Sequence, residues 1–174
     1  MKNSALNLAA VLLAVASTLS YAQSGAPNDA QIAGIVVAAN TVDVNAGEVA
    51  KSAAQSKDVK DFAQLMITDH SGVNKQASAL VKKLHVTPEE SDTSKALTKG
   101  GAENIAKLKG LKGAAFDKAY VENEVSYHQA VLDAIDKTLL PSAKNAELKG
   151  LLEKVRPVID AHLQHAKHLQ ASMK

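Results

Sequence analysis

The chain has 174 residues, no cysteine, no tryptophan and only 3% aromatic residues. Without cysteine it can form no disulfide, and it cannot carry a lipid attached through cysteine. With few aromatic residues and many Ala, Leu, Lys and Val residues, the composition favours helices over strands. We therefore predict an all-α protein that depends on side-chain packing for its stability.

Several classes of function also lack their sequence signals. The formal net charge is only +2, which gives no reason to expect a nucleic-acid partner. The sequence contains no Ser/His/Asp nucleophile pattern, no Gly-rich phosphate loop and no Walker sequence. It also lacks the Cys-x-x-Cys-His pattern of attached haem. We therefore have no basis for predicting an enzyme.

Residues 1–22 resemble a signal peptide. Lys2 precedes an apolar run from Ala5 to Ala16, and small residues flank Tyr21 in Ser20-Tyr21-Ala22. The run is about a dozen residues, shorter than the roughly 20 that a membrane-spanning helix needs. We predict cleavage near Ala22, a periplasmic or secreted mature protein, and no membrane span in the mature chain. Residues 23–28 are then a linker, and 29–174 form one domain.

Apolar residues in this domain recur at spacings of three and four, the period of an amphipathic helix. The pattern predicts four long helices, at about 29–54, 58–84, 115–139 and 145–173. Short connections make the first pair and the last pair antiparallel neighbours. Residues 85–113, which contain the expected helix breakers Gly100-Gly101, are predicted to form a short helical crossover. The fold class is therefore an antiparallel four-helix bundle.

Each predicted helix places polar residues within its apolar stripe. Asp43 and His70 both lie about 17 Å from the turn between the first two helices, because each is eleven or twelve residues from it at 1.5 Å per residue. Glu124 and His128 are one turn apart on the third helix, and His162 is central in the stripe of the fourth. We expect Asp43 and His70 at one level and Glu124 and His128 within about a turn of it. The height of His162 depends on where the last helix begins, and one turn lower is one possibility.

These five inward residues support two hypotheses. In the first, Asp43, His70, Glu124, His128 and His162 bind one divalent metal ion, with zinc, copper, iron and manganese as candidates. A di-iron centre is not expected, because His70 and His162 lack the Glu-x-x-His pattern. In the second, Asp43 pairs with His70 and Glu124 with His128 in a structural network. The network is the simpler interpretation. In that case we expect the protein to be a metal-free envelope or stress-related module that binds a protein partner.

Three further polar residues lie beside these stripes. Asp69 is next to His70, but adjacent helix residues do not face each other, so we expect Asp69 to pair at the surface. His165 lies at the edge of the stripe of the fourth helix and His168 outside it, so we predict both to be surface residues.

Several segments carry a family resemblance. Residues 62–70 contain the run Met-Ile-Thr-Asp-His, and residues 113–120 read Gly-Ala-Ala-Phe-Asp-Lys-Ala-Tyr. With His128 and the segment from Arg156-Pro157 to His162-Leu163, they resemble an exported bacterial family known as domain of unknown function 4142. That resemblance implies a ferritin-like bundle in the cell envelope. It implies no established activity.

Overall fold

A computed structural model describes residues 25–173, which contain helices and no strand. The all-α prediction is therefore confirmed for this part of the chain, while the signal peptide predicted at 1–22 lies outside it. In chain order, the elements are α1 (Asp29–Ala53), α2 (Lys57–Lys83), α3 (Asp92–Lys109), α4 (Gly113–Ala134), the π-helical turn η1 (Ile135–Leu139), α5 (Leu140–Ser142) and α6 (Ala146–Ser172).

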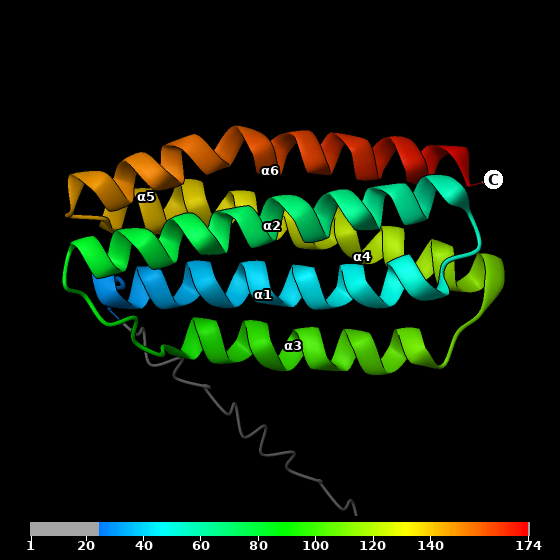
Figure 1. The fold of residues 1–174 in the computed structure, drawn as a ribbon, viewed down its shortest axis with the longest axis horizontal. Coiled ribbons are helices and arrows are strands. Elements are labelled where there is room, and N and C mark those ends of the chain that lie inside the picture. Colours follow the sequence, from blue (N-terminus) through cyan, green and yellow to red (C-terminus); the bar gives the residue numbers. More distant parts are fainter. Residues whose placement is uncertain (1–24, 174) are drawn as a thin grey trace, which may run out of the picture.

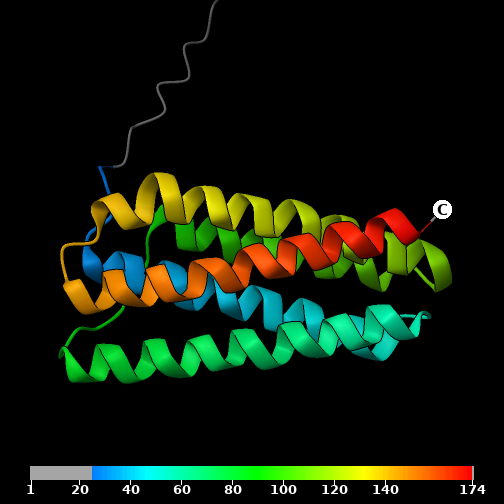
Figure 2. The same ribbon diagram turned by 90° about the horizontal axis from the view of Figure 1, so that it is seen from above.

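Four long helices, α1, α2, α4 and α6, lie side by side along the long axis of the molecule (Figure 1). The α1–α2 and α4–α6 pairs are antiparallel. In the chain, α3 connects α2 to α4, and it leads back along the bundle from the end of α2 toward the start of α4. The helices α2 and α4 therefore point in the same direction (Figures 1 and 2). This topology is compatible with ferritin-like bundles, which have one long crossover.

The crossover is longer and more regular than expected. It is one 18-residue helix, α3, with Gly100 and Gly101 in its interior and its N-terminus capped by Ser91. A Cβ atom at Gly101 would lie 2.7 Å from Cγ1 of Val42, a residue of α1. The glycine therefore allows α3 to approach α1 closely, which explains why it does not end the helix.

Aspartate side chains close both helix–helix turns. The carboxylate of Asp117 on α4 accepts the two backbone N–H groups at 55–56, at 2.9 and 2.7 Å. The carboxylate of Asp29 on α1 accepts those at 144–145, at 2.9 and 3.0 Å. Each turn is thus fixed to a helix that is distant in sequence, and this sets the relative heights of the helices.

The buried apolar side chains form two clusters, and the predicted polar residues lie between them. One cluster contains Phe62, Met66 and Tyr120, and the other contains Ile32, Val73 and Leu132. On every bundle helix the polar position separates residues of the two clusters, as His70 does between Met66 and Val73. The bundle therefore has a polar layer at mid-height, with an apolar layer on each side.

Among residues 25–173, α1 is the helix with the length and hydropathy of a membrane span. Its inward residues pack in the bundle, where Ile32 and Ala50 are fully buried. Burial in a protein core accounts for the apolar character of such a helix.

Candidate metal centre

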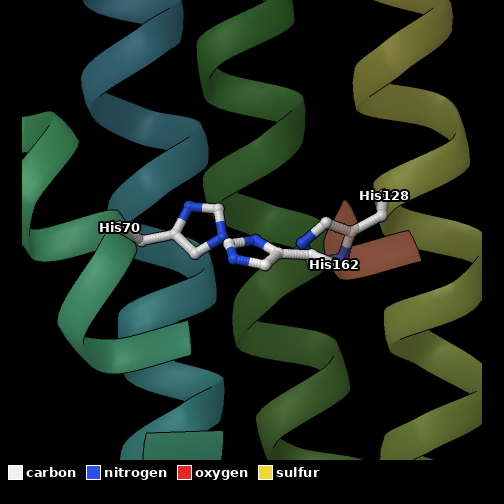
Figure 3. A group of neighbouring side chains, drawn as sticks. All are labelled: His70, His128 and His162. Atoms are coloured by element: carbon white, nitrogen blue, oxygen red, sulfur yellow. The ribbon is translucent and has the colours of Figure 1, made fainter. Parts of the chain in front are cut away.

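All five residues predicted from the sequence lie in the polar layer. Their exposed fractions are 3% or less: Asp43 on α1, His70 on α2, Glu124 and His128 on α4, and His162 on α6. The three imidazoles extend toward one another from three different helices (Figure 3). The four bundle helices thus each contribute to one cluster.

The imidazole rings are close and at one level. Ring centroids are 5.2 Å apart for His70 and His162, 5.5 Å for His128 and His162, and 5.6 Å for His70 and His128. One ring nitrogen of each lies within 4.8 Å of the others. The sequence left the height of His162 dependent on the start of the last helix, and the structure places it level with the other two imidazoles (Figure 3). The clamp of Asp29 on the turn before α6 fixes the height of that helix.

Asn40 determines which nitrogen of His70 carries a proton. The Asn40 Nδ2 atom donates to the carbonyl oxygen of Val36 at 2.7 Å, so its Oδ1 atom faces His70. The His70 Nδ1–H then donates to Asn40 Oδ1 at 2.7 Å. In the neutral imidazole, the proton on Nδ1 leaves Nε2 with a free lone pair.

The other two imidazoles are anchored by oxygen acceptors too. The His128 Nδ1–H donates to the backbone carbonyl of Glu124 at 3.0 Å, and the His162 Nε2–H donates to the Asp69 carboxylate at 2.9 Å. The free nitrogens are therefore Nε2 of His128 and Nδ1 of His162. An oxygen acceptor on the outer nitrogen is the usual support of a metal-binding histidine.

The inner atoms of the layer have no hydrogen-bond partners. They are Nε2 of His70 and of His128, Nδ1 of His162, and both carboxyl oxygens of Asp43 and Glu124. Buried polar atoms in folded proteins are nearly always paired, so a group of seven at one place requires an explanation. A bound cation would satisfy the nitrogen lone pairs and the carboxylate oxygens together.

Asp43 lies between two of the imidazoles. Its Oδ2 atom is 2.8 Å from His70 Nε2 and 3.4 Å from His128 Nε2. Neither contact has hydrogen-bond geometry, although the first has the distance of a hydrogen bond. Asp43, Glu124 and His128 also each offer a ligand atom within 4.8 Å of the others. Both carboxylates are thus close enough to share an ion with His128.

The environment drives the pKa values of the two carboxyl groups apart. Burial raises the pKa of Glu124 well above its usual range, and the negative charge of Asp43 adds to this effect. Burial acts on Asp43 as well, but the electrostatic effect of the adjacent imidazole of His70, 2.8 Å away, outweighs it and lowers the pKa of Asp43. Asp43 is therefore the more acidic of the two carboxyl groups, and Glu124 is the one that retains its proton to higher pH.

Burial also keeps two of the imidazoles neutral. Desolvation lowers the pKa of His128 from 6.5 to about 4, although the charge of Asp43 opposes the change. Desolvation lowers the pKa of His162 too, against the hydrogen bond to Asp69. Neutral imidazole is the form that binds a metal ion.

Three further residues at the polar layer were not predicted from the sequence. Asp69 does avoid His70, as expected, but it pairs with His162 of α6 and has 34% of its side chain exposed. Asn40 was not selected, although it precedes Asp43 by one turn on the inward face of α1. The hydroxyl of Tyr120 is buried without a partner, and burial, together with the charges of Glu124 and Asp43, raises its pKa.

The two outer histidines behave as the stripe predicted. Both His165 and His168 are exposed, and the ring of His165 lies edge-on to Phe62 with centroids 5.0 Å apart. Neither contributes to the polar layer.

Fold and site together define an all-α bundle protein with a buried layer of three imidazoles and two carboxyl groups. The chain belongs to the family described as Domain of unknown function (DUF4142), whose family model matches residues 14–169. Comparisons with curated proteins and with solved structures find no match.

Proposed function

We propose that the polar layer binds one divalent transition-metal ion. His70, His128 and His162 supply three nitrogens, and Asp43 supplies an oxygen. The observation that carries the proposal is the orientation of the three imidazoles. Each directs its N–H to an oxygen acceptor outside the cluster and has its other nitrogen unpartnered inside it.

The donor set favours zinc, copper or iron. Imidazole suits these metals, whereas manganese prefers more oxygen ligands. Nitrogens bound to a tetrahedral zinc ion at 2.0–2.1 Å lie about 3.3 Å from one another. One nitrogen of each ring lies within 4.8 Å of the others, so metal binding would draw these nitrogens closer together.

Charge balance supports the same assignment. An isolated ion in a dry core is costly, so its charge must be compensated. The ionised Asp43 compensates one charge of a divalent ion, and loss of the proton from Glu124 compensates the second. Asp69, whose side chain is 34% exposed, contacts His162 from the solvent side of the layer and adds a carboxyl group near the site.

The structural network remains the alternative. In its favour are the hydrogen bonds from the imidazoles to Asn40, Glu124 and Asp69. Against it, the contacts predicted for the network lack hydrogen-bond geometry, and both Glu124 carboxyl oxygens remain unpartnered. A network that leaves its central atoms unpaired is a weak source of stability.

Calorimetric titration of tag-free, chelator-treated protein tests the proposal. Zinc, copper(II), nickel and manganese are titrated in air, and iron(II) without oxygen. We expect one ion per chain for zinc or copper, and a stabilisation of about 2.7 kcal/mol at free metal 100-fold above Kd. His70→Ala should abolish the one-to-one site, and circular dichroism verifies that its helices persist.

His168→Ala is the matched control, because His168 is an exposed imidazole on α6. It should bind the metal as the wild type does. If His70→Ala fails to fold, His70→Gln takes its place. Unchanged metal uptake after loss of His70 would reject the proposed site, and absence of binding in the wild type would favour the metal-free network.

We also propose that the protein is exported and acts in the periplasm or outside the cell. The apolar run before Ser20-Tyr21-Ala22 supports this location. Mass spectrometry of the protein recovered from the native host should give a mature chain that begins at Gln23. A full-length chain that retains Met1 would contradict the cleavage site.

A further inference from the structure

A cavity of about 130 Å³ lies in the apolar half of the bundle next to the polar layer. Aliphatic side chains from α1, α3, α4, η1 and α6 form most of its wall, among them Ile35, Leu97, Val131, Ile135 and Leu152. Protein cores are normally close-packed, with few voids larger than a water molecule. A cavity of this size is therefore not a product of ordinary packing.

One end of the cavity is formed by the candidate metal centre. His70, His128 and Asn40 are the polar residues there, and Tyr127 lies beside them. The Tyr127 hydroxyl donates to the carbonyl oxygen of Ala39 at 2.8 Å. The hydroxyl thus already has a hydrogen-bond partner, and this bond holds the side chain in place. A molecule in the cavity would thus contact two of the three imidazoles at one end and aliphatic side chains everywhere else.

The cavity has a route to solvent between α3 and α4. Two residues of its wall, Thr93 and Ala130, are exposed. A second hollow runs along the surface between α3 and α4 and shares Thr93, Leu97 and Tyr127 with the cavity. Entry from this side requires no unfolding of the bundle.

The π-helical turn contributes directly to the cavity. Residues Ile135 and Leu139 are the buried residues of η1, and both line the wall. A π turn adds a residue to the helical turn, and such turns occur often at functional sites. The irregularity in the helix that follows α4 therefore coincides with the empty space.

We propose that this cavity binds a small, neutral, apolar molecule no larger than one aromatic ring. The mostly aliphatic lining disfavours charged and strongly polar ligands, because outside the end formed by His70 and His128 it offers few hydrogen bonds in exchange for those to water. An apolar cavity of roughly 150 Å³ in another protein stays dry and binds benzene or xenon, which sets the scale. Binding itself does not need a metal. Only the position of the ligand beside an ion rests on the proposed function.

Benzene is the probe, titrated calorimetrically into metal-free protein with methyl NMR as the second readout. We expect one benzene per chain and shifts of the Ile35, Ile135 and Leu139 methyl signals. The signal of Leu65, an exposed residue, should not move. Benzoate, an aromatic ring with a charge, should bind at least tenfold more weakly.

Ala134→Leu fills the cavity, because Ala134 lines it without contributing to the polar layer. It should weaken benzene binding at least tenfold and leave zinc stoichiometry unchanged. Ala171→Leu, at an exposed position on α6, is the matched control and should bind both. Because methyl shifts in the wild type locate the ligand, the test holds even if Ala134→Leu folds poorly.

Absence of benzene binding to the wild type, or shifts elsewhere than at the cavity methyls, would overturn the cavity proposal. Wild-type affinity in a folded Ala134→Leu would do the same. If zinc fails to bind and benzene still shifts these methyls, the metal site alone is wrong. If zinc binds and benzene does not, the cavity proposal alone is wrong.

Discussion

Acidification of the metal-free protein should destabilise it through His128. In the unfolded chain this imidazole has its ordinary pKa of 6.5, and in the folded protein burial lowers the pKa to about 4. Between these values the unfolded state binds more protons than the folded state. The contribution of His128 to the free energy of unfolding is therefore fully present above pH 6.5, and it is lost as the pH falls toward 4.

The size of the effect follows from that pKa difference. Each pH unit between the two pKa values corresponds to about 1.4 kcal/mol, so the group contributes about 3 kcal/mol in total. Between pH 7.5 and 4.5 the loss should be about 2–3 kcal/mol. His162 adds to the loss in the same direction, because its pKa is lowered as well.

Glu124 acts in the opposite direction over part of this range. Its pKa is raised in the folded state, so its contribution to stability is complete below its unfolded pKa of about 4.5 and is lost as the pH rises through the folded pKa. The comparison is therefore made in a Glu124→Gln background, where only one of the two opposing groups titrates. Within that background, His128→Gln removes the second.

Urea unfolding in the presence of a chelator, followed by circular dichroism from pH 4.5 to 7.5, measures the two slopes. The variant that retains His128 should lose about 2–3 kcal/mol more than the double variant on acidification. Equal slopes would show that His128 has the same pKa in both states. The dry environment inferred for the polar layer would then be wrong.

Three further predictions concern the supports of the site and of the fold. Asp69→Ala removes the acceptor of an imidazole N–H and should weaken zinc binding 10- to 100-fold in a competition with a chromogenic chelator; unchanged affinity would exclude a supporting role. Asp117→Ala removes two charge-assisted hydrogen bonds and should lower the urea-unfolding free energy by about 3 kcal/mol, and a loss below about 0.5 kcal/mol would contradict the clamp. Gly34→Ala sets a Cβ atom 2.1 Å from the Glu89 carbonyl oxygen and should lower the melting temperature, whereas Gly72→Ala meets nothing within 4 Å and should raise it.

The height of the site could be predicted from the sequence because it depends on counting along regular helices. Asp43 and His70 lie on helices joined by a short turn, so equal distances from that turn placed them opposite each other. Glu124 and His128 followed from their one-turn spacing on a single helix.

Features that depend on contacts between distant segments could not be predicted in this way. Gly100-Gly101 indicates a break by local rules, but the approach to Val42 makes the second glycine compatible with α3. Asp69 pairs with His162, 93 residues away, and no local pattern marks that contact. The cavity requires side chains from five elements and the π turn, and none of these is visible in a helical stripe.

The outward anchoring of the three imidazoles has a consequence for the heat of metal binding. An ion would meet three inner nitrogens, because the N–H of each imidazole donates to an oxygen acceptor on the outer side of the layer, and it would meet the carboxyl group of Asp43, whose pKa is lowered. Burial raises the pKa of Glu124 well above its usual range, so this carboxyl group is the candidate source of a released proton. Titrations in buffers with different ionisation enthalpies should therefore count about one proton released per ion if Glu124 becomes a ligand, and none if it stays in the outer sphere.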